Sequence, residues 1–288
     1  MESMVTVILE EYGDLHRSVL QFLMAVKSIE FEVLYTVFVK LVIKCLLEKH
    51  HPEPSSSDQE EQLRDLLRQA RPELPTLSPE SLVKTIALIN RELASLDLEI
   101  VETLAQDDEK NINVSFVNTK SSPSIKLSTS YTEKEISVIN ELIDQMFESP
   151  FDDEDNLTYS LSYTQALNVA KRNIQTITDA QKFINKLESS GWLETVKGKY
   201  TLSARALAEL KSYLISKFET KSAENPDGTV SLCHGCKELI TMGYRCSKSR
   251  CYVCFHEHCR DLFTQSHRTE TCPADQCDSS LENMVSFY

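Results

Sequence analysis

The densest cluster of cysteine residues in this chain lies near its carboxyl end. Eight of the nine cysteines fall between Cys233 and Cys277, together with several histidines. So short a segment, with few aliphatic side chains, cannot bury enough apolar surface to fold without help. Disulfides or metal ions must therefore cross-link it. This requirement constrains the fold of the carboxyl-terminal region more than any other feature of the sequence.

The rest of the sequence favours metal ions over disulfides. The amino-terminal stretch lacks the basic start and long apolar run of a secretory signal. The most apolar run, residues 31–47, is interrupted by Glu32, Lys40 and Lys44, so we expect no membrane span. An odd number of cysteines also argues against complete disulfide pairing. We therefore expect a reducing compartment, in which clustered thiols serve as metal ligands.

Composition excludes two broad classes of function. The chain has only 6 glycines and no Gly-rich phosphate-binding motif, which argues against a nucleotide-binding enzyme. Its formal net charge of −14 argues against a protein that coats nucleic acid over its whole surface. A local basic face remains compatible with that charge.

Helical periodicity dominates the amino-terminal half of the chain. Apolar residues recur at steps of three and four over residues 14–26, 31–45 and 79–96, the last helix starting at Ser78-Pro79. The period then changes to two in residues 98–104 and 112–116, which predicts a β-hairpin. Helices followed by a terminal hairpin are the outline of a winged helix.

The same order of elements recurs further along the chain. Thr132 and Glu135 form a capping box at the start of a helix. A helix from Thr178, a tight hairpin over 192–202 and a helix over 203–218 follow. We therefore predict a mainly α protein with small β-hairpins. Its expected parts are a winged helix (1–118), a linker (119–131), a second winged helix (132–220) and a RING-like zinc domain (229–280).

The cysteine and histidine spacing predicts two zinc ions. Zinc prefers tetrahedral sites of thiolate and imidazole, delivered by residue pairs close in sequence. Four such pairs occur in order, and in a cross-braced arrangement the first and third share one ion while the second and fourth share the other. The predicted ligands are Cys233, Cys236, His256 and Cys259 for one ion and Cys246, Cys251, Cys272 and Cys277 for the other. Sites with four protein ligands leave no open coordination position, so the zinc is expected to be structural.

Several neighbouring residues are alternative ligands. Cys254 forms a tighter pair with Cys251 and would leave Cys246 unused. His258 is an alternative to His256, although His256 has the better spacing to Cys259. His267 is a weaker candidate, and His234, which lies between two ligands in sequence, is expected to be a bystander.

A basic face is the main candidate for nucleic-acid contact. In a winged helix, the third helix enters the major groove and the hairpin touches the phosphate backbone. Lys182 and Lys186 lie one turn apart on the predicted third helix, and Lys197 and Lys199 lie at the tip of the hairpin. The helix carries no arginine for base readout, so we favour a protein-interaction module over a sequence-specific DNA reader. Weak, non-specific DNA contact is the alternative.

Motifs in three parts of the chain resemble one known family. Residues 233–277 resemble a variant RING finger with the ligand order of four cysteines, one histidine and three cysteines. The stretch Gly191-Trp-Leu-Glu with Lys199-Tyr-Thr-Leu-Ser203 resembles the second winged helix of the RING-bearing non-SMC element subunit of the structural-maintenance-of-chromosomes five–six complex. Residues 89–100 resemble the end of that family's first winged helix.

This resemblance implies a nuclear, chromosome-associated protein that acts in DNA repair and recombination. It implies winged helices that bind a MAGE-like subunit, a kleisin subunit as a further partner, and SMC subunits in the same complex. It also implies a RING that supports ubiquitin transfer. A RING has no nucleophile of its own and acts by orienting the charged conjugating enzyme.

The residues that would contact a ubiquitin-conjugating enzyme match the ligase pattern only in part. Leu239 and Ile240 are expected to form the apolar docking spot, and Pro273 matches the Cys-Pro of many ligases. Gly235 stands where an apolar contact is common, and Asp278 stands where an activating arginine is common. We therefore expect weak or partner-dependent E3 ubiquitin transferase activity with no catalytic residue in the chain itself. The alternatives are a non-catalytic adaptor and a winged-helix DNA-binding protein with a structural zinc module.

Overall fold

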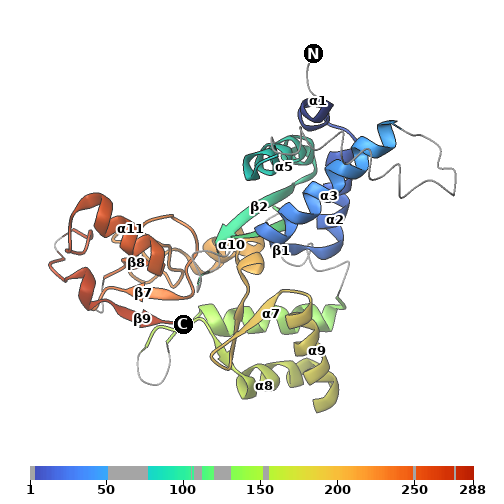
Figure 1. Cartoon of the computed structure of the whole chain (residues 1–288). Coiled ribbons are helices and arrows are strands. Elements are labelled where there is room, and N and C mark those ends of the chain that lie inside the picture. Colours follow the sequence, from blue (N-terminus) through green and yellow to red (C-terminus); the bar gives the residue numbers. More distant parts are fainter. Residues whose placement is uncertain are drawn as a thin grey trace. The chain divides into compact units, whose positions relative to one another are not determined.

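A computed structural model describes residues 4–50, 77–104, 106, 112–119, 131–151, 156–248, 251–275 and 277–288. The chain divides into two compact units (Figure 1). Unit 1 comprises residues 1–102 and 112–119, and unit 2 comprises residues 103–111 and 120–288. Most of the predicted linker, residues 120–130, lies outside the described residues. None of the described helices combines the length and apolar character that a bilayer crossing requires.

Unit 1 has the element order of a winged helix. Its helices are α1 (Met4–Glu10), α2 (Asp14–Val26), α3 (Phe31–His50) and α5 (Pro79–Leu93), followed by a short 3-10 helix (Ala94–Leu96). Strands β1 (Ser28–Glu30), β2 (Leu98–Leu104) and β3 (Ile112–Asn118) form a sheet in the order β1-β3-β2. The predicted hairpin is therefore present, and β1 adds a third strand to it. Apolar stripes of α2, α3 and α5 form the core, with Val19, Leu23 and Phe38 fully buried.

The amino-terminal part of unit 2 repeats this order. Its elements are α7 (Glu133–Phe147), β4 (Leu161–Ser162), α8 (Tyr163–Asn173), α9 (Ile177–Ser189), β5 (Leu193–Val196), β6 (Lys199–Leu202) and α10 (Ala204–Phe218). The three strands pair in the order β4-β6-β5. We call residues 131–218 the second winged helix.

Side-chain caps explain where its helices begin. Thr132 and Glu135 form the predicted capping box of α7, and the Thr132 backbone N–H donates to the Glu135 carboxylate over 2.7 Å. Helix α9 begins at Ile177, one residue before the predicted start at Thr178, because Thr176 provides its N-cap.

The remainder of unit 2 contains the cysteine-rich segment, which we call the zinc module (residues 229–288). Its elements are β7 (Gly243–Arg245), β8 (Cys254–Phe255), α11 (Glu257–His267), a 3-10 helix (Leu281–Asn283) and β9 (Val285–Phe287). The sheet has the order β8-β7-β9. Strand β9 lies beyond residue 280, where the sequence predicted the zinc domain to end.

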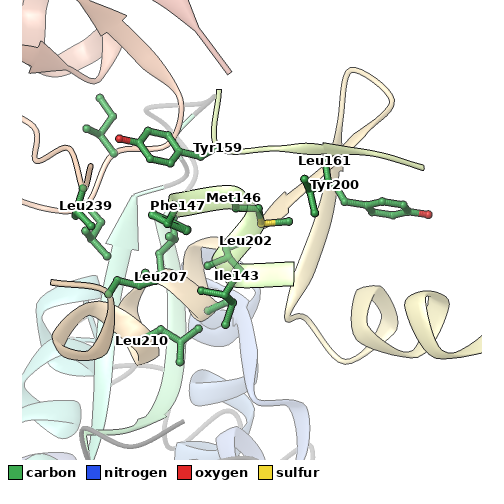
Figure 2. Close-up of a cluster of buried hydrophobic side chains, with 14 of the residues drawn as sticks. Ile143, Met146, Phe147, Tyr159, Leu161, Tyr200, Leu202, Leu207, Leu210 and Leu239 are labelled. Atoms are coloured by element: carbon green, nitrogen blue, oxygen red, sulfur yellow. The ribbon is translucent and has the colours of Figure 1, made fainter. Parts of the chain in front are cut away.

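One hydrophobic core runs through the second winged helix and the zinc module. Figure 2 shows Leu239 of the zinc module beside winged-helix side chains such as Phe147 and Leu207, and all three belong to the same buried cluster. The phenol of Tyr159, which is buried, lies 2.6 Å from the Thr229 carbonyl oxygen and 2.9 Å from Ser231 Oγ. Because these contacts are buried, we expect the two parts of unit 2 to unfold together.

Candidate metal centre

The first group of predicted ligands comes together at the start of α11. The ligand atoms of Cys233, Cys236, His256 and Cys259 all lie within 4.8 Å of one another. His256 Nδ1 lies 3.4 Å from the Cys236 sulfur and 3.9 Å from the Cys259 sulfur. Tetrahedral zinc with its usual bond lengths places such nitrogen and sulfur atoms about 3.6 Å apart. The group therefore fits a zinc ion.

The second group consists entirely of thiols. The sulfur atoms of Cys246, Cys251, Cys272 and Cys277 also lie within 4.8 Å of one another. Cys246 and Cys277 are separated by 3.7 Å between sulfurs, and so are Cys251 and Cys272. Sulfur atoms bound to one tetrahedral zinc ion lie about 3.8 Å apart. Each of the two groups could thus bind one zinc ion.

Short backbone pairings bring these residues together from distant parts of the chain. Cys233 forms an isolated parallel bridge with Cys254, which places the first pair beside β8. Cys246 directly follows β7, and its N–H donates to the Val253 carbonyl over 3.0 Å. The Cys272 N–H donates to the Ser279 carbonyl over 2.8 Å, which closes the loop holding the fourth pair.

His256 and Cys259 occupy special positions in α11. His256 is the N-cap residue, and Cys259 is the third residue of the helix. The His256 side chain makes no capping hydrogen bond, because its Nδ1 faces the sulfurs of the first group instead. A zinc ion held by this pair would therefore fix the start of the helix, in the place that a polar cap usually fills.

The thiols are in electrostatic conflict with one another. Burial raises the pKa of the Cys251 thiol to about 11, and burial together with the charge of Cys233 raises that of Cys259 to about 11. A hydrogen bond with Cys236 is the main cause that lowers the pKa of Cys233, to about 3. A doubly charged metal ion removes this conflict, since it stabilises all of the thiolates at once.

Gly235 has a steric role in the first group. A Cβ atom at this position would lie 2.9 Å from the Cys259 Cβ, closer than such carbons approach in proteins. The absence of a side chain therefore lets the pair Cys233–Cys236 approach α11. This explains a glycine where many RING fingers have an apolar residue.

The alternative ligands lie outside both groups. Cys254 is buried in β8, and burial raises the pKa of its thiol to about 12. His258 stacks on His256, with ring centroids 5.5 Å apart, and does not join the group. His234 contacts the rings of both Phe255 and Phe263, and His267 stacks on Phe263 at the end of α11.

The expected docking spot for a conjugating enzyme is not on the surface. Leu239 and Ile240 are 6% and 1% exposed and belong to the core shared with the winged helix. The prediction that they form an exposed docking spot was wrong. Apolar residues that follow the first pair of zinc ligands face the solvent only where no other element covers them, and here the second winged helix covers both. Pro273 is half-buried, and Asp278 is exposed and forms an ion pair with Lys248.

The four predicted DNA-contacting lysines differ in their surroundings. Lys186 Nζ lies 3.1 Å from Glu135 and 4.5 Å from the centre of the Tyr131 ring. Lys182 lies 3.8 Å from Asp179, and Lys197 lies 3.4 Å from the centre of the Tyr288 ring. Lys199 pairs with Val196 at the hairpin turn and is half-buried. Three of the four thus have partners within unit 2, and DNA contact through them stays a prediction.

Sequence reasoning missed one structurally important residue, Tyr159. Tyr159 lies between predicted elements, in a stretch without periodicity, yet it is 1% exposed and joins the two parts of unit 2. Its partners are about 70 residues away in sequence, so only the folded chain shows the contact.

Comparison with known proteins agrees with this architecture. Residues 16–210 match the family described as the Nse1 non-SMC component of the SMC5-6 complex, and residues 233–277 match a RING-like domain. The chain belongs to the Nse1 family. This confirms the resemblance identified from the winged-helix and cysteine motifs.

Individual Nse1 proteins are distant in sequence. The Schizosaccharomyces pombe protein "Non-structural maintenance of chromosomes element 1" is 25% identical over 69% of this chain and 77% of its own length. The human homologue is 25% identical over 64% of each chain. A chain of a solved Nse1-Nse3-Nse4 complex has a TM-score of 0.65 at 16% identity, covering 96% of this chain and 100% of its own. The fold is therefore shared over nearly the whole of this Nse1-family chain.

Proposed function

We propose that this Nse1-family chain is a subunit of an SMC5-6-type complex and assembles there with an Nse3-type MAGE-like subunit and an Nse4-type kleisin subunit. The observation that carries this proposal is the family match over both winged helices, supported by a fold shared with a chain of an Nse1-Nse3-Nse4 complex. The chain then works in DNA repair and recombination, in the nucleus and on chromosomes, with SMC subunits in the same assembly.

The zinc module supports ubiquitin transfer in this proposal. The two interleaved groups of ligands would hold a small, rigid docking platform without a large core. Such a platform binds a charged conjugating enzyme and holds its thioester for attack by a substrate lysine. No side chain of the module acts as a nucleophile. Because Leu239 and Ile240 are buried, the docking contact must come from other residues.

Leu262 is the best candidate for that contact. It lies on α11, beside the first group of ligands, and its exposure of 63% is the highest among the large apolar side chains described as exposed. Protein interfaces are centred on apolar side chains that become fully buried on binding. An exposed leucine next to the metal groups fits this role.

A ubiquitin-transfer assay with purified components tests the proposal. The full chain is combined with a charged conjugating enzyme, with and without an Nse3-type partner, and discharge to free lysine is measured. We expect discharge to rise when the partner is present, and Leu262→Asp to reduce it at least tenfold. The matched control is Val285→Asp on β9, which also alters an exposed apolar residue of the zinc module.

A non-catalytic adaptor is the competing function. Its test needs a substitution that leaves the shared core of unit 2 intact. Substitution of a zinc ligand would disturb the winged helix as well, so it cannot distinguish a ligase from an adaptor. Leu262→Asp leaves the core intact. If discharge is absent for the wild type with its partner while co-purification with Nse3-type and Nse4-type subunits is normal, the chain is an adaptor.

A further inference from the structure

A small cavity lies within unit 2, where the second winged helix, the connecting residues 219–228 and the zinc module meet. Its volume is about 110 Å³. Apolar and aromatic side chains form much of its wall: Pro150, Phe151, Leu157, Pro226 and Tyr252. For comparison, an engineered cavity of about 150 Å³ holds one benzene molecule. The cavity is therefore large enough for one short side chain.

Arg245 gives this cavity a positive charge. It is the last residue of β7 and pairs directly with Cys254 of β8. Paired residues of antiparallel strands project to the same face, so both side chains leave the sheet together, and both residues line the cavity. The Nε atom of Arg245 is buried and has no hydrogen-bond partner among the described residues.

Lys221 provides a second cation. It also lines the cavity, and its Nζ lies 5.9 Å from the centre of the Phe151 ring. Among the described residues that line the cavity, Asp227 is the one carboxylate, and no ion pair in that part of the chain joins it to either cation. Two cations therefore face one carboxylate and the sulfur of Cys251, a member of the second metal group, in a largely apolar space.

We propose that this cavity receives a glutamate or aspartate side chain from an acidic segment of a partner protein. A buried guanidinium N–H without an acceptor is unfavourable, and a carboxylate is its strongest natural acceptor. The apolar walls suit the methylene groups that carry the carboxylate. All of the lining residues precede α11 in sequence, and the site does not depend on the proposed ubiquitin transfer.

A titration of the full, zinc-loaded chain with a minimal probe tests this. The probe is N-acetylglutamate amide, its neutral counterpart is N-acetylglutamine amide, and the amide NMR signals of Gly228 and Tyr252, which line the cavity, report binding. We expect saturable shifts with a Kd on the order of 1 mM, typical of a ligand of this size. The neutral probe should bind at least tenfold more weakly.

Two variants and a control locate the site. Arg245→Gln should weaken binding at least tenfold, and Lys221→Gln, which lies outside the zinc-module sheet, several-fold. Arg91→Gln, the same kind of change at an exposed arginine of α5 in unit 1, should leave binding unchanged. The spectra themselves show whether each variant keeps its fold.

Four results would overturn the proposal. They are the absence of saturable shifts, equal shifts with the neutral probe, tighter binding of inorganic phosphate than of the carboxylate, and unchanged affinity in both cavity variants. A fifth concerns the chain's own acidic residues 152–155, which adjoin Phe151 in sequence. If replacing them by their amides raises the affinity for the probe tenfold, the chain's own segment is the occupant rather than a partner's.

Discussion

Replacing Leu239 with alanine should destabilise the second winged helix, although Leu239 itself lies in the zinc module. Leu239 is 6% exposed and is part of the core that the zinc module shares with the winged helix. A Leu→Ala change at such a site costs about 2–5 kcal/mol of unfolding free energy. For a unit of about 150–250 residues, a central cost of about 3 kcal/mol lowers Tm by roughly 6–12 °C.

The single tryptophan of the chain makes this measurable. Trp192 is buried in the second winged helix, so its fluorescence reports directly on the unfolding of that part. Thermal unfolding is followed by Trp192 fluorescence in excess zinc. We expect Leu239→Ala to lower the Tm of this transition by the same roughly 6–12 °C. Leu262→Ala is the matched control, since the same change at a leucine 63% exposed should cost about 0.5 kcal/mol or less. An unchanged Trp192 midpoint in Leu239→Ala would refute the shared core.

Three further outcomes follow from the structure. Tyr159→Phe should lower the unfolding free energy by about 1–3 kcal/mol, because it leaves buried polar partners unsatisfied, and Trp192 fluorescence during chemical denaturation measures it. Elemental analysis should find two zinc ions in the wild type and in Cys254→Ser, but one in Cys277→Ser; two ions in the last variant would show that the second group is misassigned. Glu135→Gln should cost about 0.5–1 kcal/mol. Burial opposes the ionisation of Glu135, but hydrogen bonds from Thr132 and Lys186 outweigh it and lower the pKa of its carboxyl. The cost of the substitution is therefore fully present above the unfolded-state pKa and vanishes as pH falls through the lower folded-state pKa. Denaturation curves that show the same cost at every pH would contradict this.

Local signals in the sequence were sufficient to predict most of the helices and the grouping of the metal-binding thiols. The capping box of Thr132 and Glu135 acts within one turn of helix, so it can be read without knowledge of the rest of the fold. The metal groups also follow a local rule, because zinc requires short pairs of ligands, and the structure brings together the same two sets of four residues.

Features that depend on contacts between distant residues could not be predicted in this way. The strands β1 and β4 have three and two residues, too few to show a period of two, and each is defined only by pairing with a strand far along the chain. The burial of Leu239 and Ile240 depends on the winged helix that covers them. Their apolar character is the same for a docking surface as for a core, so the sequence did not distinguish the two.

The interleaving of the two metal groups has a consequence for the newly made polypeptide. As the ribosome releases the chain, Cys233, Cys236, Cys246 and Cys251 emerge before His256. These four thiols belong to two different groups in the folded protein, yet together they offer a complete set of ligands to any zinc ion present. A nascent chain that binds zinc at once must later exchange two of these sulfurs for His256 and Cys259. Maturation of the subunit should therefore be slower when free zinc is abundant during translation than when the ion is supplied after release.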